Sequence, residues 1–129
     1  MIEEYTKDHY QLLAEWWKGH GWDAVPAQVL PKLGVLGTVN DKPCAAGFVY
    51  MDNSVGVAMM EWVVTDPSAN PLNVYKALKE VQEYLCRRVK ELGYGVILTS
   101  CKQESLAKFY QKQEFHKTDE GLTHFIKTL

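Results

Sequence analysis

The sequence lacks an apolar run close to the roughly 18 residues that a membrane-spanning helix needs. It begins with Met1, Ile2, Glu3 and Glu4, an acidic start without the apolar core of a secretory signal, so we expect a cytoplasmic protein that binds no membrane. A basic excess is also missing. Lysine and arginine number 14 against 16 for aspartate and glutamate, a net charge of −2, which argues against a broad nucleic-acid-binding surface.

Cysteine is scarce and shows no pairing pattern. The chain has three cysteines, Cys44, Cys86 and Cys101. They lie far apart and none forms a C-x-x-C motif, so neither a disulfide framework nor a zinc site is expected. The histidines likewise lack the spacing of metal ligands. We therefore expect reduced thiols, an inert and buried thiol at Cys101, and no bound metal.

What is present is the composition of one globular domain. The 129 residues are 47% apolar and 23% charged, which is close to the average for folded proteins. A chain of this length buries a core without disulfides or a metal and leaves little room for a second domain. We expect a single domain over residues 1–129, as a monomer or a homodimer.

Apolar periodicity and turn residues divide this chain into alternating elements. Five strands are predicted, at residues 2–5, 34–39, 44–51, 55–65 and 96–100. Three helices are predicted, at residues 6–19, 71–92 and 103–113, with a loop or short helix at 22–31. A final hairpin is predicted from strands at 116–118 and 122–127 around a turn at 119–121.

The order of these elements predicts a mixed α+β fold. A helix that joins two buried strands favours a parallel pair, 55–65 with 96–100, crossing over through the helix at 71–92. The other strands are linked by short turns and are expected to be antiparallel. The result is a central, mixed and mostly antiparallel sheet with helices on both faces.

Two segments and the element order resemble the GNAT N-acetyltransferase superfamily, over nearly the whole chain. Residues 65–78 match, without a gap, the turn and phosphate-binding loop that open the long helix of that family. Residues 107–115 resemble its late helix, which ends Tyr-x-Lys-x-Gly-Phe, here with Tyr110, Lys112 and Phe115. The resemblance implies that the parallel strand pair splays apart to receive acetyl-coenzyme A as the cosubstrate.

The chain departs from the family in the phosphate loop and at the end of the late helix. Asn70 stands at the Gln/Arg position, Asn73 at the first loop glycine, Tyr75 at the second small residue, and Glu114 at the glycine before Phe115. Asn73 is the mildest change, because asparagine tolerates a positive φ. Tyr75 is the most serious, since its side chain either fills the space of the pyrophosphate or points aside. Pro71, in addition, removes one backbone N–H from the loop.

The resemblance implies that residues at the matching positions of this chain contact the coenzyme. Backbone groups of the strand end at 63–65 are expected to pair with the pantetheine arm, and the loop at 70–75 to hold the pyrophosphate by its N–H groups. The predicted cofactor-binding residues are Val63, Val64, Thr65, Asn70, Leu72, Asn73, Val74, Tyr75 and Tyr110.

Two residues are candidates for the chemistry. Tyr110 matches the family tyrosine near the coenzyme A sulfur, and a phenol is a suitable acid for a leaving thiolate. The alternative is a core aromatic on an apolar helix face. Glu61 lies inside an apolar strand on which family members often place a general base, directly or through water. The alternative is a salt bridge at the sheet surface.

Aromatic residues gather at the end of the first helix, where the family builds its acceptor pocket. Trp16 and Trp17 lie on the apolar stripe of that helix and are expected in the core. Trp22 and His20 follow the helix and remain available to contact an amine substrate.

These patterns leave two main hypotheses. The first is an acyl-coenzyme A-dependent N-acyltransferase, in which a small-molecule or protein amine attacks the thioester directly in a ternary complex. The alternative is a catalytically inactive GNAT-like binding module, such as a small viral or accessory protein, that has lost the coenzyme and acts through a protein partner. A third possibility keeps the fold and uses another anionic cofactor.

Overall fold

The structure is a computed structural model that describes all 129 residues. The chain forms two compact units, Met1–Thr99 and Ser100–Leu129, and each is described by itself. The elements of the first unit are β1 (Ile2–Glu4), α1 (Tyr10–Gly19), β2 (Leu33–Val39), β3 (Lys42–Met51), β4 (Val57–Thr65), α2 (Pro71–Glu91) and β5 (Val96–Thr99), with short 3₁₀ turns at Lys7–His9 and Ala27–Val29. The second unit contains α3 (Glu104–Lys112).

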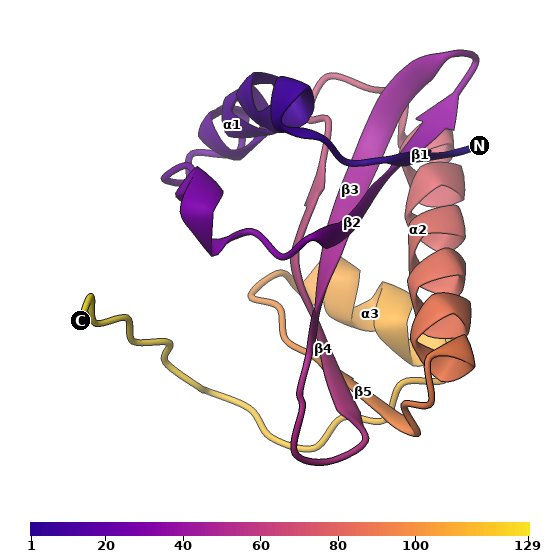
Figure 1. The fold of residues 1–129 in the computed structure, drawn as a ribbon. Coiled ribbons are helices and arrows are strands. Elements are labelled where there is room, and N and C mark those ends of the chain that lie inside the picture. The colour runs from indigo at the N-terminus through magenta and orange to yellow at the C-terminus, as the bar shows by residue number, and fades with distance from the viewer. The chain divides into compact units, whose positions relative to one another are not determined.

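The first unit is built on a five-stranded sheet whose strands lie in the order of the sequence (Figure 1). The pairs β1–β2, β2–β3 and β3–β4 are antiparallel, and β4–β5 is parallel. Helix α2 supplies the long connection that a parallel pair requires. The predicted mixed, mostly antiparallel sheet is therefore confirmed.

A two-residue turn joins β2 to β3. Asn40 and Asp41 have φ values of 52° and 64°, between the paired residues Val39 and Lys42. Two successive positive φ angles are the mark of the tight hairpin turn whose twist matches that of the strands. The turn is shorter than the predicted segment 40–43, because Pro43 already pairs with Thr38 in the ladder.

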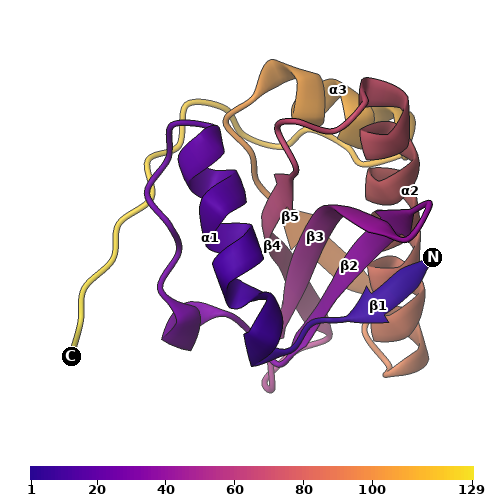
Figure 2. The ribbon, with the colours of Figure 1, turned by 90° about the horizontal axis from the view of Figure 1, so that it is seen from above.

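The two long helices of this unit cover opposite faces of the sheet (Figure 2). On one face, α1 and the segment after it contribute Leu13, Trp16, Trp17 and Val25 to a buried cluster with Leu36, Ala46, Phe48 and Val64. On the other face, α2 buries Ala77, Val81, Leu85 and Val89. The close approach of α2 explains Gly37, because a Cβ there would lie 2.7 Å from the Ala77 carbonyl oxygen.

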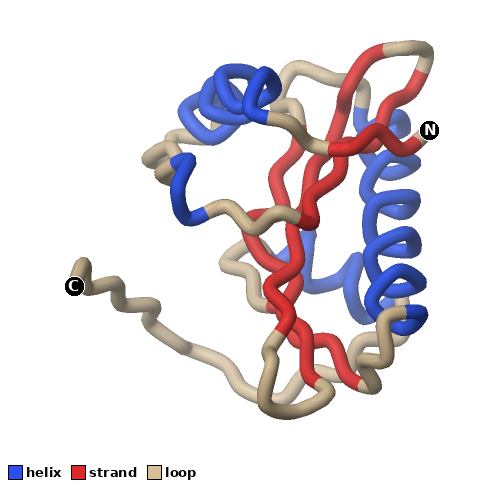
Figure 3. Tube along the Cα trace, viewed as in Figure 1, coloured by secondary structure: helices blue, strands red, loops and turns tan.

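The predicted terminal hairpin is wrong. Residues 113–129 contain no strand, and Figure 3 draws the chain after α3 as loop. A three-residue strand gains too little from pairing in a lone hairpin, however well its turn residues fit. No helix has the length and apolar content needed to cross a membrane, and no group of three or more His, Cys, Asp or Glu side chains is placed to hold a metal ion.

Candidate active site

The parallel pair separates part-way along β4. The ladder runs from Val57 opposite Val96 to Met60 opposite Thr99, where β5 ends. Strand β4 continues to Thr65, still paired with β3 on its other side. Residues 61–65 therefore present an edge that β5 does not cover, which we call the open edge. It is the place where the splayed strands were predicted.

Hydrogen-bond register decides which way the backbone points at this edge. The Asp66 N–H donates to the Cys44 carbonyl (2.9 Å), and the preceding residue Thr65 lies opposite Ala45. Opposed residues in an antiparallel ladder alternate between bonded and non-bonded pairs. Thr65 belongs to a non-bonded pair, so its N–H and C=O point away from β3, toward the open edge.

A β-bulge in the middle of the open edge changes the direction of the side chains there. Glu61 lies opposite Phe48 and Val64 opposite Ala46, so Trp62 and Val63 share the single partner position between them. Trp62 has φ 57°, a backbone conformation uncommon for a bulky residue. Such bulges bend a strand and redirect side chains, often next to active sites.

The bulge brings two consecutive side chains to the α1 face. Residues directly opposite one another share a face of the sheet, so Glu61 faces the same side as the buried Phe48. Trp62 packs against the cluster that α1 completes on that side. Its indole Nε1–H donates to the Tyr50 hydroxyl (2.9 Å), which in turn donates to the Val29 carbonyl. Sequence reasoning missed Tyr50 and the role of Trp62, because a bulge leaves no signature in the apolar pattern.

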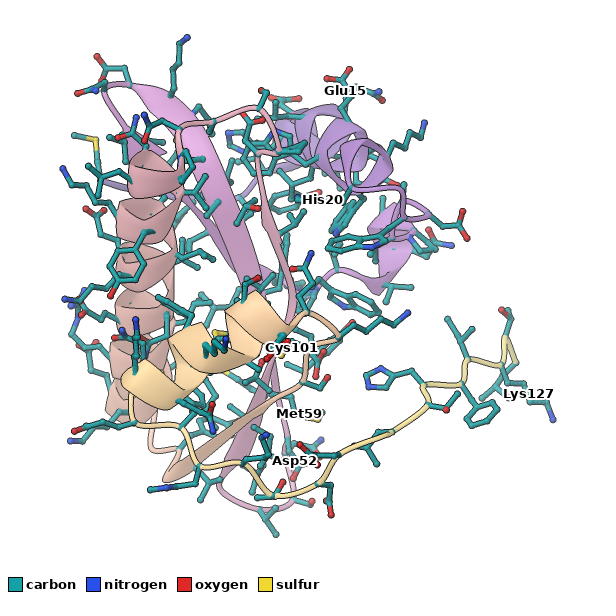
Figure 4. All side chains as sticks on the ribbon, turned by 180° about the vertical axis from the view of Figure 1, so that it is seen from behind. Glu15, His20, Asp52, Met59, Cys101 and Lys127 are labelled. Atoms are coloured by element: carbon teal, nitrogen blue, oxygen red, sulfur yellow. The ribbon has the colours of Figure 1, made fainter.

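His20 follows α1 and reaches the end of the open edge (Figure 4). Its Nε2 lies 2.9 Å from the Thr65 carbonyl oxygen and 3.3 Å from Thr65 Oγ1. The imidazole stacks on the Trp22 ring, with centroids 4.6 Å apart and planes 18° apart.

Close packing holds the end of α1 against the end of β4. A Cβ at Gly19 would lie 2.7 Å from Pro67 Cγ, so only glycine fits there without a shift. Trp16 and Trp17 are buried, as predicted, whereas Trp22 is 37% exposed. The two residues predicted to face a substrate, His20 and Trp22, thus lie together beside Thr65.

The segment between β4 and α2 satisfies many of its own polar groups. Asn70 is the N-cap of α2, and its side chain accepts the Leu72 N–H (2.8 Å). The Asp66 carboxylate accepts the Ser68 N–H and hydroxyl, both at 2.8 Å. Pro71 has no N–H to offer. Several N–H positions that a phosphate loop would aim at an anion are therefore already engaged or missing.

Helix positions after the cap show where the other loop residues lie. Tyr75 is 41% exposed and Leu72 is 64% exposed. A cleft of about 410 Å³ opens beside the loop, with Asn70 and Asn73 in its wall. Lys42 also lines this cleft, and so does Asp66, which places one cation and one anion beside any phosphate bound there.

Tyr110 lies on α3 in the second unit. Its ring meets Phe109 and Phe115 at centroid distances of 5.7 and 5.2 Å. The helix ends in a left-handed residue, Glu114, with φ 69°, and the Phe115 N–H returns to the Tyr110 carbonyl (3.0 Å). Glu114 stands where the resembling family has glycine, and it adopts the backbone conformation that favours glycine.

Cys101 differs from its expected environment. The side chain is exposed rather than buried. Partial desolvation raises the pKa of its thiol, which keeps the less nucleophilic protonated form. The expectation of a buried thiol is therefore wrong, while the raised pKa still favours an inert one.

The structure is similar to solved acetyltransferases at low sequence identity. The ribosomal-protein-S18-alanine N-acetyltransferase from Escherichia coli matches with a TM-score of 0.75 and 12% identity, over 92% of this chain and 79% of that protein. A GNAT-family acetyltransferase from Streptococcus pneumoniae matches with a TM-score of 0.67 and 13% identity, over 99% and 97%. The chain has the GNAT acetyltransferase fold.

A third similar solved structure comes from Trypanosoma brucei. An acetyltransferase from Trypanosoma brucei matches with a TM-score of 0.69 and 17% identity, over 98% of this chain and 99% of that one. No model of a known protein family matches the sequence, and no curated protein matches it either. This chain is therefore similar to the acetyltransferases in the arrangement of its helices and strands and not in its sequence. The roles of single residues in this GNAT fold stay predictions.

Proposed function

We propose that this chain is an acetyltransferase that moves an acetyl group from acetyl-coenzyme A to a primary amine. The observation that carries the proposal is the open edge of β4 in a GNAT fold, because an extended chain with amide groups can pair with backbone groups that no neighbouring strand covers there. Thr65 directs both its backbone groups to that edge, and Val63 and Val64 precede it in the same segment.

The proposed chemistry is a direct attack in a ternary complex. The amine nitrogen forms a bond to the thioester carbonyl carbon, and the carbon–sulfur bond then breaks. Glu61 takes the proton that the nitrogen loses, and Tyr110 gives a proton to the departing thiolate. One proton is taken up at Glu61 and one is given up at Tyr110, so the net charge of the protein does not change. Proton exchange with water then restores the Glu61 carboxylate and the Tyr110 phenol.

Glu61 is assigned the base because of its position on β4. Its pairing with Phe48 sets it on the α1 face, one residue beyond the last β4–β5 pair, where the open edge begins. His20 and Trp22 lie at the other end of the edge and supply a polar group and an aromatic face for the acceptor amine.

A second candidate function is a binding module without coenzyme. The N-terminal end of α2 favours the binding module. The Leu72 N–H there already donates to the Asn70 side chain, and Pro71 has no backbone N–H. A helix N-terminus binds an anion through such N–H groups, so their engagement weakens a pyrophosphate site.

Calorimetric titration with acetyl-coenzyme A separates the two functions. The acetyltransferase is expected to release binding heat, and with amine acceptors present it should liberate coenzyme A that a thiol reagent can measure. A titration without heat at millimolar ligand would leave the binding module as the better account.

A further inference from the structure

The His20 side chain covers a backbone carbonyl on the open edge of β4. Its Nε2 lies 2.9 Å from the Thr65 oxygen, and a carbonyl oxygen can only accept, so Nε2 carries the hydrogen. The Thr65 carbonyl points away from β3, to the side that β5 leaves uncovered. The imidazole thus occupies a position at which an added strand or an amide chain would donate.

A second side chain covers the other end of the edge. The Thr99 hydroxyl donates to the Met60 carbonyl (2.7 Å) at the last pair between β4 and β5. Trp62 and Val63 lie between these two covered carbonyls. Thr99 belongs to β5 itself, whereas His20 comes from a separate segment and is only half-buried, so rotation of its side chain uncovers Thr65 without disturbing the sheet.

We propose that His20 is a displaceable substitute for the coenzyme on the open edge. This inference rests on the proposed function. The pantetheine arm carries two amide groups, and to pair along the full edge one of its N–H groups must replace His20 Nε2–H at the Thr65 carbonyl. Without ligand, the imidazole keeps that carbonyl bonded and blunts an edge that would otherwise attract another chain.

The substitution has a definite consequence for affinity. Binding exchanges one hydrogen bond to Thr65 for another, so the ligand gains little from that contact while His20 is present. Removing the competitor lets the full bond count toward affinity. A typical net hydrogen bond then predicts about 2- to 10-fold tighter binding of coenzyme A by the variant His20→Ala.

The test is calorimetric titration of coenzyme A into the whole protein and two variants. His20→Ala removes the donor, and His20→Gln keeps an amide donor at a similar reach. We expect His20→Ala to bind about 2- to 10-fold more tightly than the wild type, and His20→Gln to bind within twofold of it. Equal or weaker binding by a folded His20→Ala would overturn the proposal.

Nuclear magnetic resonance of the wild type covers the case in which His20→Ala fails to fold. The ¹⁵N signals of the His20 ring, assigned with His20→Gln, should show the Nε2–H form and should shift when coenzyme A saturates the protein. Binding heat without a change in these signals overturns this inference and leaves the proposed function intact. No binding at all overturns both.

Discussion

Glu61 illustrates how a single residue is placed by its neighbours. Without the bulge, Glu61 and Val64 would face opposite sides of β4, because side chains alternate along a strand. The extra residue lets both face α1, with Glu61 opposite Phe48. A carboxylate in this partly buried position is costly unless a polar or charged group interacts with it. The amine of an acceptor substrate is such a group, which suits the role of a base.

A change of Glu61 should alter the pH dependence of acetyl transfer. The variant Glu61→Gln keeps the size of the side chain but its amide cannot accept the amine's proton. We expect the acidic limb of the pH–rate profile to disappear, as measured by steady-state rates across the pH range. An unchanged profile would assign the base to another group or to an amine that arrives deprotonated.

Tyr110 is tested by removing one oxygen atom. The variant Tyr110→Phe retains the ring contacts with Phe109 and Phe115, so coenzyme affinity should change little. Loss of a positioned acid should lower kcat by about 10²- to 10⁴-fold. Combined with Glu61→Gln, the two losses should be far from additive, because both groups serve one transition state. If Tyr110→Phe keeps the wild-type kcat, the role of Tyr110 is to pack in the core and not to donate a proton.

At the scale of elements, the end of α3 stores a small backbone strain. Glu114 has φ 69°, a backbone conformation that costs a residue other than glycine about 1 kcal/mol of folding free energy. The variant Glu114→Gly should therefore raise the free energy of unfolding by up to about 1 kcal/mol, as measured by urea denaturation. Gln113→Gly is the matched control: φ there is −90°, so glycine gains nothing and should destabilise.

The turn between β3 and β4 predicts a pH effect on stability. The Asp52 carboxylate accepts the Ser54 hydroxyl (2.6 Å) and the N–H groups of Ser54 and Val55, and these bonds lower its pKa below the usual range. Because the folded pKa lies below the unfolded value of about 3.9, its contribution is present above that pH and is lost as pH falls through the folded pKa.

The matching experiment compares the wild type with Asp52→Ala. The variant should be less stable at neutral pH, and the difference in unfolding free energy should shrink as the pH falls below the unfolded pKa of about 3.9 and through the lower folded pKa. Ser54→Ala is the control. It removes the hydroxyl hydrogen bond that contributes most to the lowered pKa of Asp52, so that pKa should rise toward its usual range. A difference independent of pH would contradict the assignment.

Elements were easier to predict from the sequence than the contacts between them. Helix α2 and its glycine end, with Gly93 at φ 97°, follow from a long apolar stripe and a stop residue. The terminal hairpin failed because alternation over three residues carries little information. The bond between His20 and Thr65 joins residues 45 apart, and no local pattern encodes it.

At the scale of the whole molecule, ligand binding should appear as thermal stability. A ligand that binds only the folded chain adds about 2.7 kcal/mol at 100 times its dissociation constant. Acetyl-coenzyme A should therefore raise the melting temperature by several degrees, as followed by calorimetry. Adenosine diphosphate serves as a comparison, because it offers the pyrophosphate without the arm that the open edge would receive.

At this scale, the fold and the phosphate loop depend on different features of the sequence. Strand order, the parallel pair and the two covered faces follow from periodicity and connection length, and solved acetyltransferases match this structure at only 12–17% identity. The phosphate loop, by contrast, depends on single N–H groups. Asn70 and Pro71 change those groups without changing the fold, so fold and coenzyme binding are separate questions for this chain.

The stacking of His20 on Trp22 also gives this protein an optical label of its own. Two of the four tryptophans, Trp16 and Trp17, are packed in the core of the folded chain, so their emission should change little when a ligand binds at the open edge. Trp22 is partly exposed and lies against an imidazole, so its emission depends on whether that ring stays in place. Movement at the end of β4 should thus be visible as a change in fluorescence, without any dye or engineered residue.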